Sequence, residues 1–267
     1  MLNKPRFFIV TPSFNQAQFI EQTIVSILNQ EECYVTLLVM DGGSSDSTRT
    51  ILKKFGKEPN FFWVSEKDEG QSDALNKGIK AIKKHKPKSI DIFAYLNSDD
   101  YYLPHALVEV VRGFTQHPRA NWLVADAIIV NEHGAEIQRP IRMYKRFWRK
   151  LLSAPVLSIL NPIPQPATFI RYSALQKTGL FNQKLRYTMD YEYWHRLFQS
   201  VGRPLVISLP LAAFRIHEAS KGGSQFKKQF TEELEVSQQF TNNSTLLSLH
   251  KLHNLLITGI YKIIKSF

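Results

Sequence analysis

The segment Ala94-Tyr-Leu-Asn-Ser-Asp-Asp-Tyr-Tyr-Leu-Pro104 places two adjacent carboxylates, Asp99 and Asp100, directly after a run of apolar residues. That run, residues 92–96, has the length and composition of a buried strand. Neighbouring carboxylates repel each other, and each costs free energy to remove from water unless a positive charge lies against it. A turn is one explanation, because Asn, Ser and Asp all favour loops. A divalent metal ion is the other, and the rest of the sequence has to distinguish them.

Composition limits the classes of protein to consider. The chain has 267 residues, 43% of them hydrophobic, which suits one large domain or a domain with an appendage. The single cysteine, Cys33, excludes an internal disulfide and a cysteine-based zinc site. No apolar stretch approaches the ~18 residues that cross a bilayer, and the N-terminus lacks a secretory signal, so we expect a cytoplasmic protein. The net charge of +11 favours partners that carry phosphate.

Strand-like and helix-like patterns alternate over the first 130 residues. Apolar runs at 7–11, 35–40, 61–64 and 90–96 are each followed by apolar residues at helical spacing. This alternation predicts a parallel sheet with helices on both faces, in which ligands bind beyond the carboxyl ends of the strands. All four ends are polar, and three are acidic: residues 11–15, 41–46, 66–73 and 97–100. Four polar ends at one edge of a sheet indicate a binding site.

Beyond residue 120 the pattern changes. Three elements are expected there: a hairpin over residues 122–138 with its turn at 131–134, a strand over 166–171 and a helix over 187–199. Residues 143–150 are basic and aromatic, which suits either a flexible loop or a membrane contact. From Val236 onward there is no acidic residue, and six apolar side chains follow helical spacing: Leu249, Leu252, Leu256, Ile260, Ile263 and Phe267.

The strand ends resemble those of the family 2 glycosyltransferases, nucleotide-sugar enzymes of the GT-A fold. Six motifs occur in the family's order and at its spacing: Val10-Thr-Pro-Ser-Phe-Asn15, Val39-Met-Asp-Gly-Gly-Ser-Ser-Asp46, Asp73-Ala-Leu-Asn-Lys-Gly78, Leu96-Asn-Ser-Asp-Asp100, Gln165-Pro-Ala-Thr-Phe-Ile170 and Met189-Asp-Tyr-Glu-Tyr-Trp194. Each motif alone is weak, whereas six in order are specific. The chain departs from the family at Gly42, where many members carry a second Asp, and keeps Asp41.

The resemblance implies an α/β fold with a Rossmann-like, mostly parallel sheet flanked by helices. We expect a glycosyltransferase domain over residues 1–225, with a nucleotide-sugar-binding half at 1–120 and an acceptor-side half at 121–225. Residues 226–267 would form a C-terminal helical extension that the resemblance does not cover, and it would end in the amphipathic helix.

The resemblance also implies a reaction, in which an acceptor hydroxyl attacks and inverts the anomeric carbon of a nucleoside-diphosphate sugar, with UDP the expected nucleotide. The leaving diphosphate gains charge, which Mn²⁺ or Mg²⁺ would stabilise. These ions take one or two carboxylates plus phosphate oxygens. Asp100 would bind the metal directly, and Asp99 would reach the ribose or the metal. His217 matches a third metal ligand or phosphate contact of some members, although a lone histidine is more often structural.

Through the same resemblance, donor binding is assigned to the ends of the first four strands. Asp41 would accept the imide N–H of uracil. The alternative role for Asp41 is to cap the next helix, and Asp46 is better placed for that. Phe14 would face the base or belong to the core, and Asp73 would border the donor or cap its helix. The full set of donor residues is Thr11, Pro12, Ser13, Phe14, Asn15, Asp41, Asp73, Asn76, Ser98 and Asp99.

On the acceptor side, Asp190 matches the family's catalytic base and Glu192 is its rival. The two lie ~200° apart on a helix, so only one can face the site. Gln165, Glu192 and Trp194 are expected near the acceptor. A saccharide or lipid-linked acceptor, used in cell-surface polysaccharide or glycolipid synthesis, would explain residues 143–150 and the C-terminal helix as contacts with an anionic membrane at its inner face.

Two other classes of protein fit part of the sequence. A sugar nucleotidyltransferase has a similar sheet but needs a Gly-rich, Arg-containing loop after the first strand, where this chain has Thr11-Pro-Ser-Phe-Asn15. A nucleic-acid-binding protein fits the net charge, but no recognised motif occurs and acidic strand ends would repel a phosphate backbone. We therefore expect no nucleic-acid partner.

Overall fold

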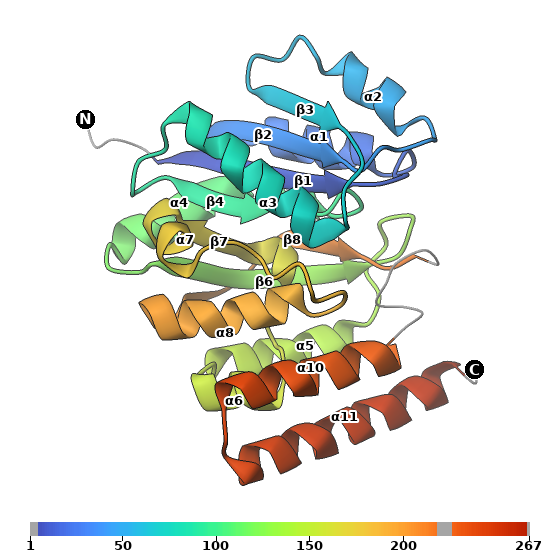
Figure 1. Ribbon diagram of the computed structural model, residues 1–267, viewed down its shortest axis with the longest axis vertical. Helices are drawn as coiled ribbons and strands as arrows, with labels where there is room; N and C mark the ends of the chain where they lie inside the picture. Colours follow the sequence, from blue (N-terminus) through green and yellow to red (C-terminus); the bar gives the residue numbers. More distant parts are fainter. Residues whose placement is uncertain (1–4, 218–225, 266–267) are drawn as a thin grey trace.

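The computed structural model describes residues 5–217 and 226–265, with side chains described over 5–217 and 228–259. One eight-stranded sheet runs through the chain in the order β3-β2-β1-β4-β7-β6-β8-β5 (Figure 1). Its strands are β1 (Arg6–Ser13), β2 (Tyr34–Asp41), β3 (Phe61–Ser65), β4 (Ile92–Tyr95), β5 (Tyr101–Tyr102), β6 (Trp122–Val130), β7 (Thr168–Arg171) and β8 (Leu205–Arg215). The first four expected strands are present, and all of them pair in parallel. The expected α/β class and mostly parallel sheet are confirmed.

Helices cover both faces of this sheet (Figure 1). Phe8 and Val10 of β1 point into one buried cluster, whereas Phe7 and Ile9 point into the other, as the period of two along a strand requires. The helices are α1 (Ile20–Leu28), α2 (Thr48–Lys54), α3 (Gln71–Ile82), α4 (Ala106–Gln116), α5 (Arg139–Lys150), α6 (Ala154–Ile159), α7 (Tyr172–Thr178), α8 (Met189–Val201), α10 (Phe226–Phe240) and α11 (Ser244–Lys265). Short 3₁₀ turns lie at Lys83–His85 and Gln165–Ala167.

A glycine lets α3 approach the sheet closely. A Cβ atom added at Gly78 would lie 2.5 Å from Cγ1 of Val10, so a larger residue would push the helix away from β1. The close approach holds the first turn of α3 beside the carboxyl ends of β1 and β2, where the site residues lie.

The second half of the sheet differs from the expected hairpin. Residues 135–138 form no strand and make a single bridge, Val130 to Glu136. The returning segment does bond to the edge of β6 that β7 leaves free beyond Val124, since the Ile137 amide donates to the Ile129 carbonyl at 2.7 Å. It stays too short to form a strand because α5 begins at Arg139. Residues 143–150, considered as a possible loop, belong to the regular helix α5.

Helix α5 is joined to the sheet by a buried ion-pair cluster. A register shift in β6 lies at Asp126, where a bulge aims the side chain out of the ladder. The carboxylate accepts from both Arg149 and, at 3.0 Å, Arg142 Nε. Arg149 is itself buried and also donates to the carbonyl of Pro162 at 3.0 Å. Because this cluster is removed from water, loss of one partner leaves a charge uncompensated.

We therefore predict that Asp126→Ala lowers the free energy of unfolding by about 3–5 kcal/mol, since Arg149 would stay buried without its counter-ion. The matched control is Glu136→Ala, which removes the other carboxylate paired with Arg142, at 2.7 Å, from a partly exposed position. That change should cost less than about 1 kcal/mol. Urea unfolding of the three proteins measures both values, and equal losses would contradict the role given to Asp126.

Candidate functional site

The polar strand ends predicted from the sequence meet at one edge of the sheet. Strands β1 and β2 pair up to Ser13 opposite Asp41, so their ends are level. Two side-chain hydrogen bonds extend the group. Gln71 at the start of α3 donates to Asn97 at 2.6 Å, and the neighbouring Ser72 hydroxyl lies 2.8 Å from the sulfur of Met189, the first residue of α8. The donor-side turn and the start of α8 are therefore linked through α3.

The turn that carries Asp99 and Asp100 is held by Arg215 at the end of β8. The Arg215 amide donates to Asp100 Oδ1 at 2.8 Å, and its Nε donates to the backbone carbonyl of Asp99 at 2.8 Å. Burial raises the pKa of the Asp100 carboxyl, and the adjacent charge of Asp99 raises it further. The arginine thus fixes the backbone of the turn, and its positive charge offsets part of the rise in the pKa of Asp100.

The two carboxylates fit a hard divalent cation. Asp100 is buried and, among the hydrogen bonds of the described residues, receives the Arg215 amide and a long contact of 3.4 Å from Asn97. Within residues 5–217 and 226–265, no three His, Cys, Asp or Glu side chains form a metal-binding group. His217 lies 3.1 Å from Asp99 Oδ2 with its ring tilted against Phe19, so it contacts the predicted ligand Asp99. Two adjacent carboxylates suit an ion whose coordination is completed by phosphate oxygens.

Asp41 is buried at the end of β2 and held by serines. Its Oδ2 accepts from the Ser44 amide at 3.0 Å and the Ser65 hydroxyl at 2.6 Å, and its Oδ1 accepts from the Ser44 hydroxyl. Phe14, considered as a core residue, is 61% exposed beside this carboxylate's strand, so the core alternative is wrong. Asn15 closes the turn by accepting the Ser45 amide at 2.9 Å.

The departure from the family at Gly42 has a structural reason. A Cβ atom at Gly42 would lie 2.7 Å from Oδ2 of Asp68. The carboxylate of Asp68 therefore takes the space that a side chain at position 42 would need. Burial raises the pKa of the Asp68 carboxyl, and the hydrogen bond from the Gly70 amide offsets part of that rise.

Several predicted site residues carry buried polar atoms that lack a protein partner. In the part of the chain that the structure describes, such atoms include Thr11 Oγ1, Ser13 Oγ, Gln165 Oε1 and the hydroxyl of Tyr95. Gln165 Nε2 donates to the Tyr95 carbonyl at 2.7 Å, which leaves its oxygen as the unpaired atom. Buried polar groups are nearly always hydrogen-bonded, so a ligand or water is expected to complete atoms of this kind. The core residue Trp194 has such an atom too, its Nε1.

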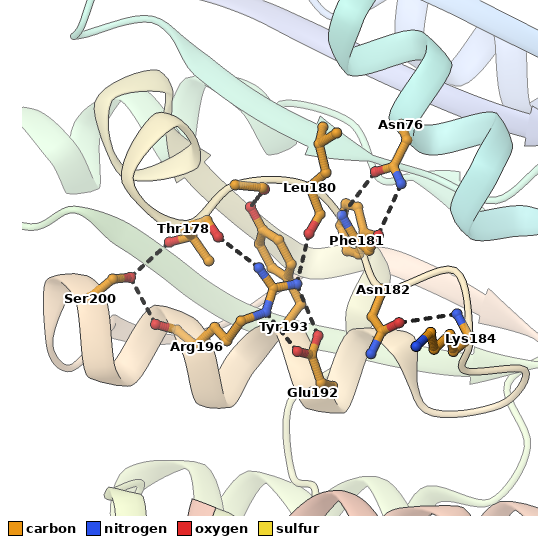
Figure 2. Close-up of polar contacts among 11 residues, drawn as sticks. Asn76, Thr178, Leu180, Phe181, Asn182, Lys184, Glu192, Tyr193, Arg196 and Ser200 are labelled. Atoms are coloured by element: carbon orange, nitrogen blue, oxygen red, sulfur yellow. Dashed lines mark hydrogen bonds and ion pairs between the residues drawn. The ribbon is translucent and has the colours of Figure 1, made fainter. Parts of the chain in front are cut away.

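Asn76 holds structure instead of lying open to a donor. Its amide donates to the Phe181 carbonyl at 2.9 Å and accepts the Phe181 amide at 2.8 Å, which occupies both ends of the side chain (Figure 2). The donor contact predicted for Asn76 is therefore unsupported. Asp73 accepts from Gln183 at 2.9 Å and pairs with Lys77 at 3.2 Å. Ser98 is buried, and its carbonyl accepts from Thr23 at 2.9 Å.

The two rival carboxylates of α8 have different surroundings. Glu192 is buried and forms a two-point ion pair with Arg196, with contacts of 2.7 and 2.9 Å (Figure 2). Arg196 also donates to the carbonyls of Thr178 and Leu180, so it ties α8 to the loop after α7. The acceptor-side role expected of Glu192 is therefore wrong. The sequence does contain a signal for this ion pair, because Arg196 follows Glu192 by four residues, the spacing at which side chains meet on a helix.

Asp190, in contrast, is half-buried and accepts only the amide of Tyr191 at 2.8 Å among the hydrogen bonds of the described residues. Burial raises the pKa of the Asp190 carboxyl, and the positive charge of Lys145 offsets part of that rise. Trp194 is fully buried and stacks on Trp122 with ring centres 6.1 Å apart. The expected acceptor contact of Trp194 is therefore wrong, because its ring belongs to the core.

Sequence reasoning missed two residues that support the site. Arg215, which fixes the carboxylate turn, lies two residues before the predicted His217, but no local pattern marks a residue whose partners are more than 80 positions away. Glu232 on α10 contacts the segment before Asp190 and lies beyond the motifs. Its only sequence signal is that it belongs to the last acidic group before the acid-free tail.

Comparison with proteins of known sequence gives relatives of one kind. An uncharacterized glycosyltransferase of Rickettsia typhi is 26% identical over 219 residues, which are 80% of this chain and 65% of the relative. The chain thus spans less than two thirds of that protein.

Solved structures show the same fold. TarS of S. aureus, in complex with UDP-GlcNAc, has a TM-score of 0.67 at 17% identity, over 87% of this chain and 65% of its own. The mannosyltransferase PcManGT of Pyrobaculum calidifontis, in complex with GDP-Man and Mn²⁺, has a TM-score of 0.69 at 15% identity, over 95% and 69%. The family model for glycosyl transferase family 2 matches residues 8–179, more than half of the chain. With these motifs and this fold, the chain belongs to glycosyl transferase family 2.

Proposed function

We propose that the protein is an inverting glycosyltransferase that moves a sugar from a nucleoside-diphosphate donor, UDP-linked, to an acceptor hydroxyl. The observation that carries the proposal is the meeting of Asp41, at the end of β2, with the adjacent Asp99 and Asp100, after β4, at the carboxyl ends of parallel strands. The start of α3 links this edge to α8, which carries Asp190, because Gln71 donates to Asn97 and Ser72 contacts Met189.

In this proposal each part of the site has one task. Phe14, Asp41 and the polar atoms of Thr11 and Ser13 bind the nucleoside. A Mn²⁺ or Mg²⁺ ion held by Asp99 and Asp100 would stabilise the charge that develops on the leaving diphosphate. Asp190 takes the proton of the acceptor hydroxyl as the new bond forms. A relative of the same fold binds GDP-Man and Mn²⁺ and another binds UDP-GlcNAc, which supports a metal-assisted nucleotide-sugar site.

For the metal we predict that Asp100→Asn abolishes Mn²⁺-dependent binding of UDP, measured by calorimetry. Asparagine keeps an oxygen that can accept the Arg215 amide, which alanine would leave unpaired in a buried position. The melting temperature without metal should therefore not fall. Unchanged Mn²⁺ dependence of UDP binding in this variant would show that the metal assignment is wrong.

For the base we predict that Asp190→Asn lowers turnover of the nucleotide sugar by ~10²-fold or more and leaves UDP affinity unchanged. Because burial raises the pKa of Asp190, wild-type turnover should fall on the acid side at a pH above the ordinary range of an aspartate. The assay is nucleotide release from a panel of UDP- and GDP-sugars. Glu192→Gln serves as the comparison, and it should lower stability more than it lowers the turnover of folded enzyme.

A second part of the proposal is that the protein docks on an anionic membrane surface. No helix in residues 5–217 or 226–265 has the length and hydropathy to cross a bilayer. Four leucines of α11 are nevertheless 43–70% exposed: Leu249, Leu252, Leu255 and Leu256. The buried face of α11 is instead centred on His250, which bonds to the Ser158 carbonyl at 2.9 Å. The predicted apolar stripe thus faces away from the domain at Leu249, Leu252 and Leu256. Its other members are outside the described part of the chain: the side chains of Ile260 and Ile263, and all of Phe267.

Helix α5 extends this apolar surface. Met143, Tyr144 and Phe147 are exposed, and Tyr144 stacks on His253 of α11 with ring centres 6.2 Å apart. Helices α5 and α11 themselves carry basic residues and no acidic one, because residues 137–189 and 236–267 contain no Asp or Glu. Exposed aliphatic and aromatic side chains beside basic ones suit an anionic lipid interface, and a lipid-linked acceptor would be met there.

We predict that the protein sediments with vesicles containing phosphatidylglycerol and not with phosphatidylcholine alone, and that high salt weakens the binding. Replacing Leu255 and Leu256 by Gln should reduce the bound fraction at least ~10-fold, because each leucine loses apolar burial in the interface. The control is Leu209→Gln, a leucine that is 46% exposed on β8. Equal binding of the two variants would exclude this face as the docking surface.

A further inference from the structure

A carboxylate from α10 caps the helix that carries Asp190. Three consecutive backbone amides before α8 donate to Glu232 Oε1: Arg186 at 3.1 Å, Tyr187 at 2.9 Å and Thr188 at 2.9 Å. The hydroxyl of Thr188 donates to the same oxygen at 2.7 Å, and the Arg186 amide also lies 3.2 Å from Oε2. One side chain thus accepts all three backbone amides and the threonine hydroxyl of a segment that ends two residues before Asp190.

The contact lies at the residues just before the helix, because it binds the amides of residues 186–188 and α8 begins at Met189. The first amides of a helix have no partner within it, and the side chain of the N-cap residue normally accepts one of them. Thr188 is the N-cap residue of α8, yet its side chain accepts no amide of the helix. Its hydroxyl instead donates to Glu232, which lies 44 residues later in the chain. A negative charge at this end also interacts favourably with the helix dipole.

Glu232 is itself presented by a fixed element. Val236, one turn later on α10, is fully buried in the core cluster that contains Tyr191 of α8. Ser237 is buried, and its hydroxyl donates to the Ser158 carbonyl of α6 at 2.8 Å. Helix α10 contacts α6 and α8, and Figure 1 shows it beyond α8 on the side away from the sheet. Helix α10 therefore holds the Glu232 carboxylate in a fixed position against the residues just before α8.

We propose that Glu232 is a positioning residue for Asp190, which it aims at the acceptor hydroxyl by fixing residues 186–188. The inference rests on the proposed role of Asp190 as the base. A displacement of about 1 Å in a catalytic group can cost ~10²-fold in rate. Glu232 can therefore affect turnover without touching substrate, because it fixes the residues that precede the base. It also makes α10, outside the family model's residues 8–179, a working part of the site.

Hydrogen exchange tests the cap without any substrate. In Glu232→Ala the amides of residues 186–188 should exchange at least about tenfold faster, because they lose their acceptor. The matched control is Glu235→Ala, the same residue type on the same helix but exposed, which should leave that segment unchanged. Glu232→Gln keeps one acceptor oxygen and should give an intermediate rate, and it serves if the alanine variant does not fold. Unchanged exchange in folded Glu232 variants would overturn the proposal.

Turnover then tests whether the cap acts through the base. With the UDP- or GDP-sugar that gives nucleotide release, Glu232→Ala should lower kcat at least about tenfold and leave the donor KM unchanged. Added to Asp190→Asn, it should cause no further loss, since a residue that acts only through Asp190 has nothing left to position. A further tenfold loss in the double variant would overturn the proposal. Full turnover of Asp190→Asn alone would instead refute the base assignment, and the exchange result on the cap would stand.

Discussion

The site depends on how one arginine holds two adjacent carboxylates. Arg215 offsets the charge of this pair only in part, because the hydrogen bonds of its guanidinium go to carbonyl and amide oxygens and not to the two carboxylates. Its Nε bonds to the Asp99 carbonyl, and its terminal nitrogens contact the Glu132 carbonyl and Gln22. The turn is thereby rigid while its charges are only partly compensated. A buried pair of like charges is costly, and a cation with a diphosphate is the kind of ligand that removes the cost.

The kind of partner distinguishes carboxylates that stabilise the fold from those that are available for binding or catalysis. Asp126 and Glu192 are each matched by arginines, and both are buried parts of the scaffold. Asp100 and Asp190 are placed at element ends, and their main contacts are backbone amides. Burial raises the pKa of both. The distinction lies in the partner, because acidic residues of either kind occur on strands and helices alike.

The sequence allowed the first four strands and their polar ends to be predicted because those signals are local. An apolar run of period two and the motif that follows it occupy a few consecutive positions, as at residues 92–100. Roles that depend on distant partners could not be read in this way. The long strand β8 was missed. Asn76 and Trp194 were given site roles, although Asn76 bonds to the backbone of Phe181 and Trp194 stacks on Trp122. Glu232 was missed for the same reason, since its partners lie more than 40 residues earlier.

The continuous sheet limits how this protein can be divided or rebuilt. Strand β7 is inserted between β4 and β6, and β5, from the first half of the chain, pairs with β8 from the second. The two halves of the chain are therefore not separable near residue 120. Exchanging one half between relatives would break the pairing of β4 with β7 and of β5 with β8. Any hinge between them would strain the same ladders. A change that keeps this sheet unbroken is confined to the loops and helices around it.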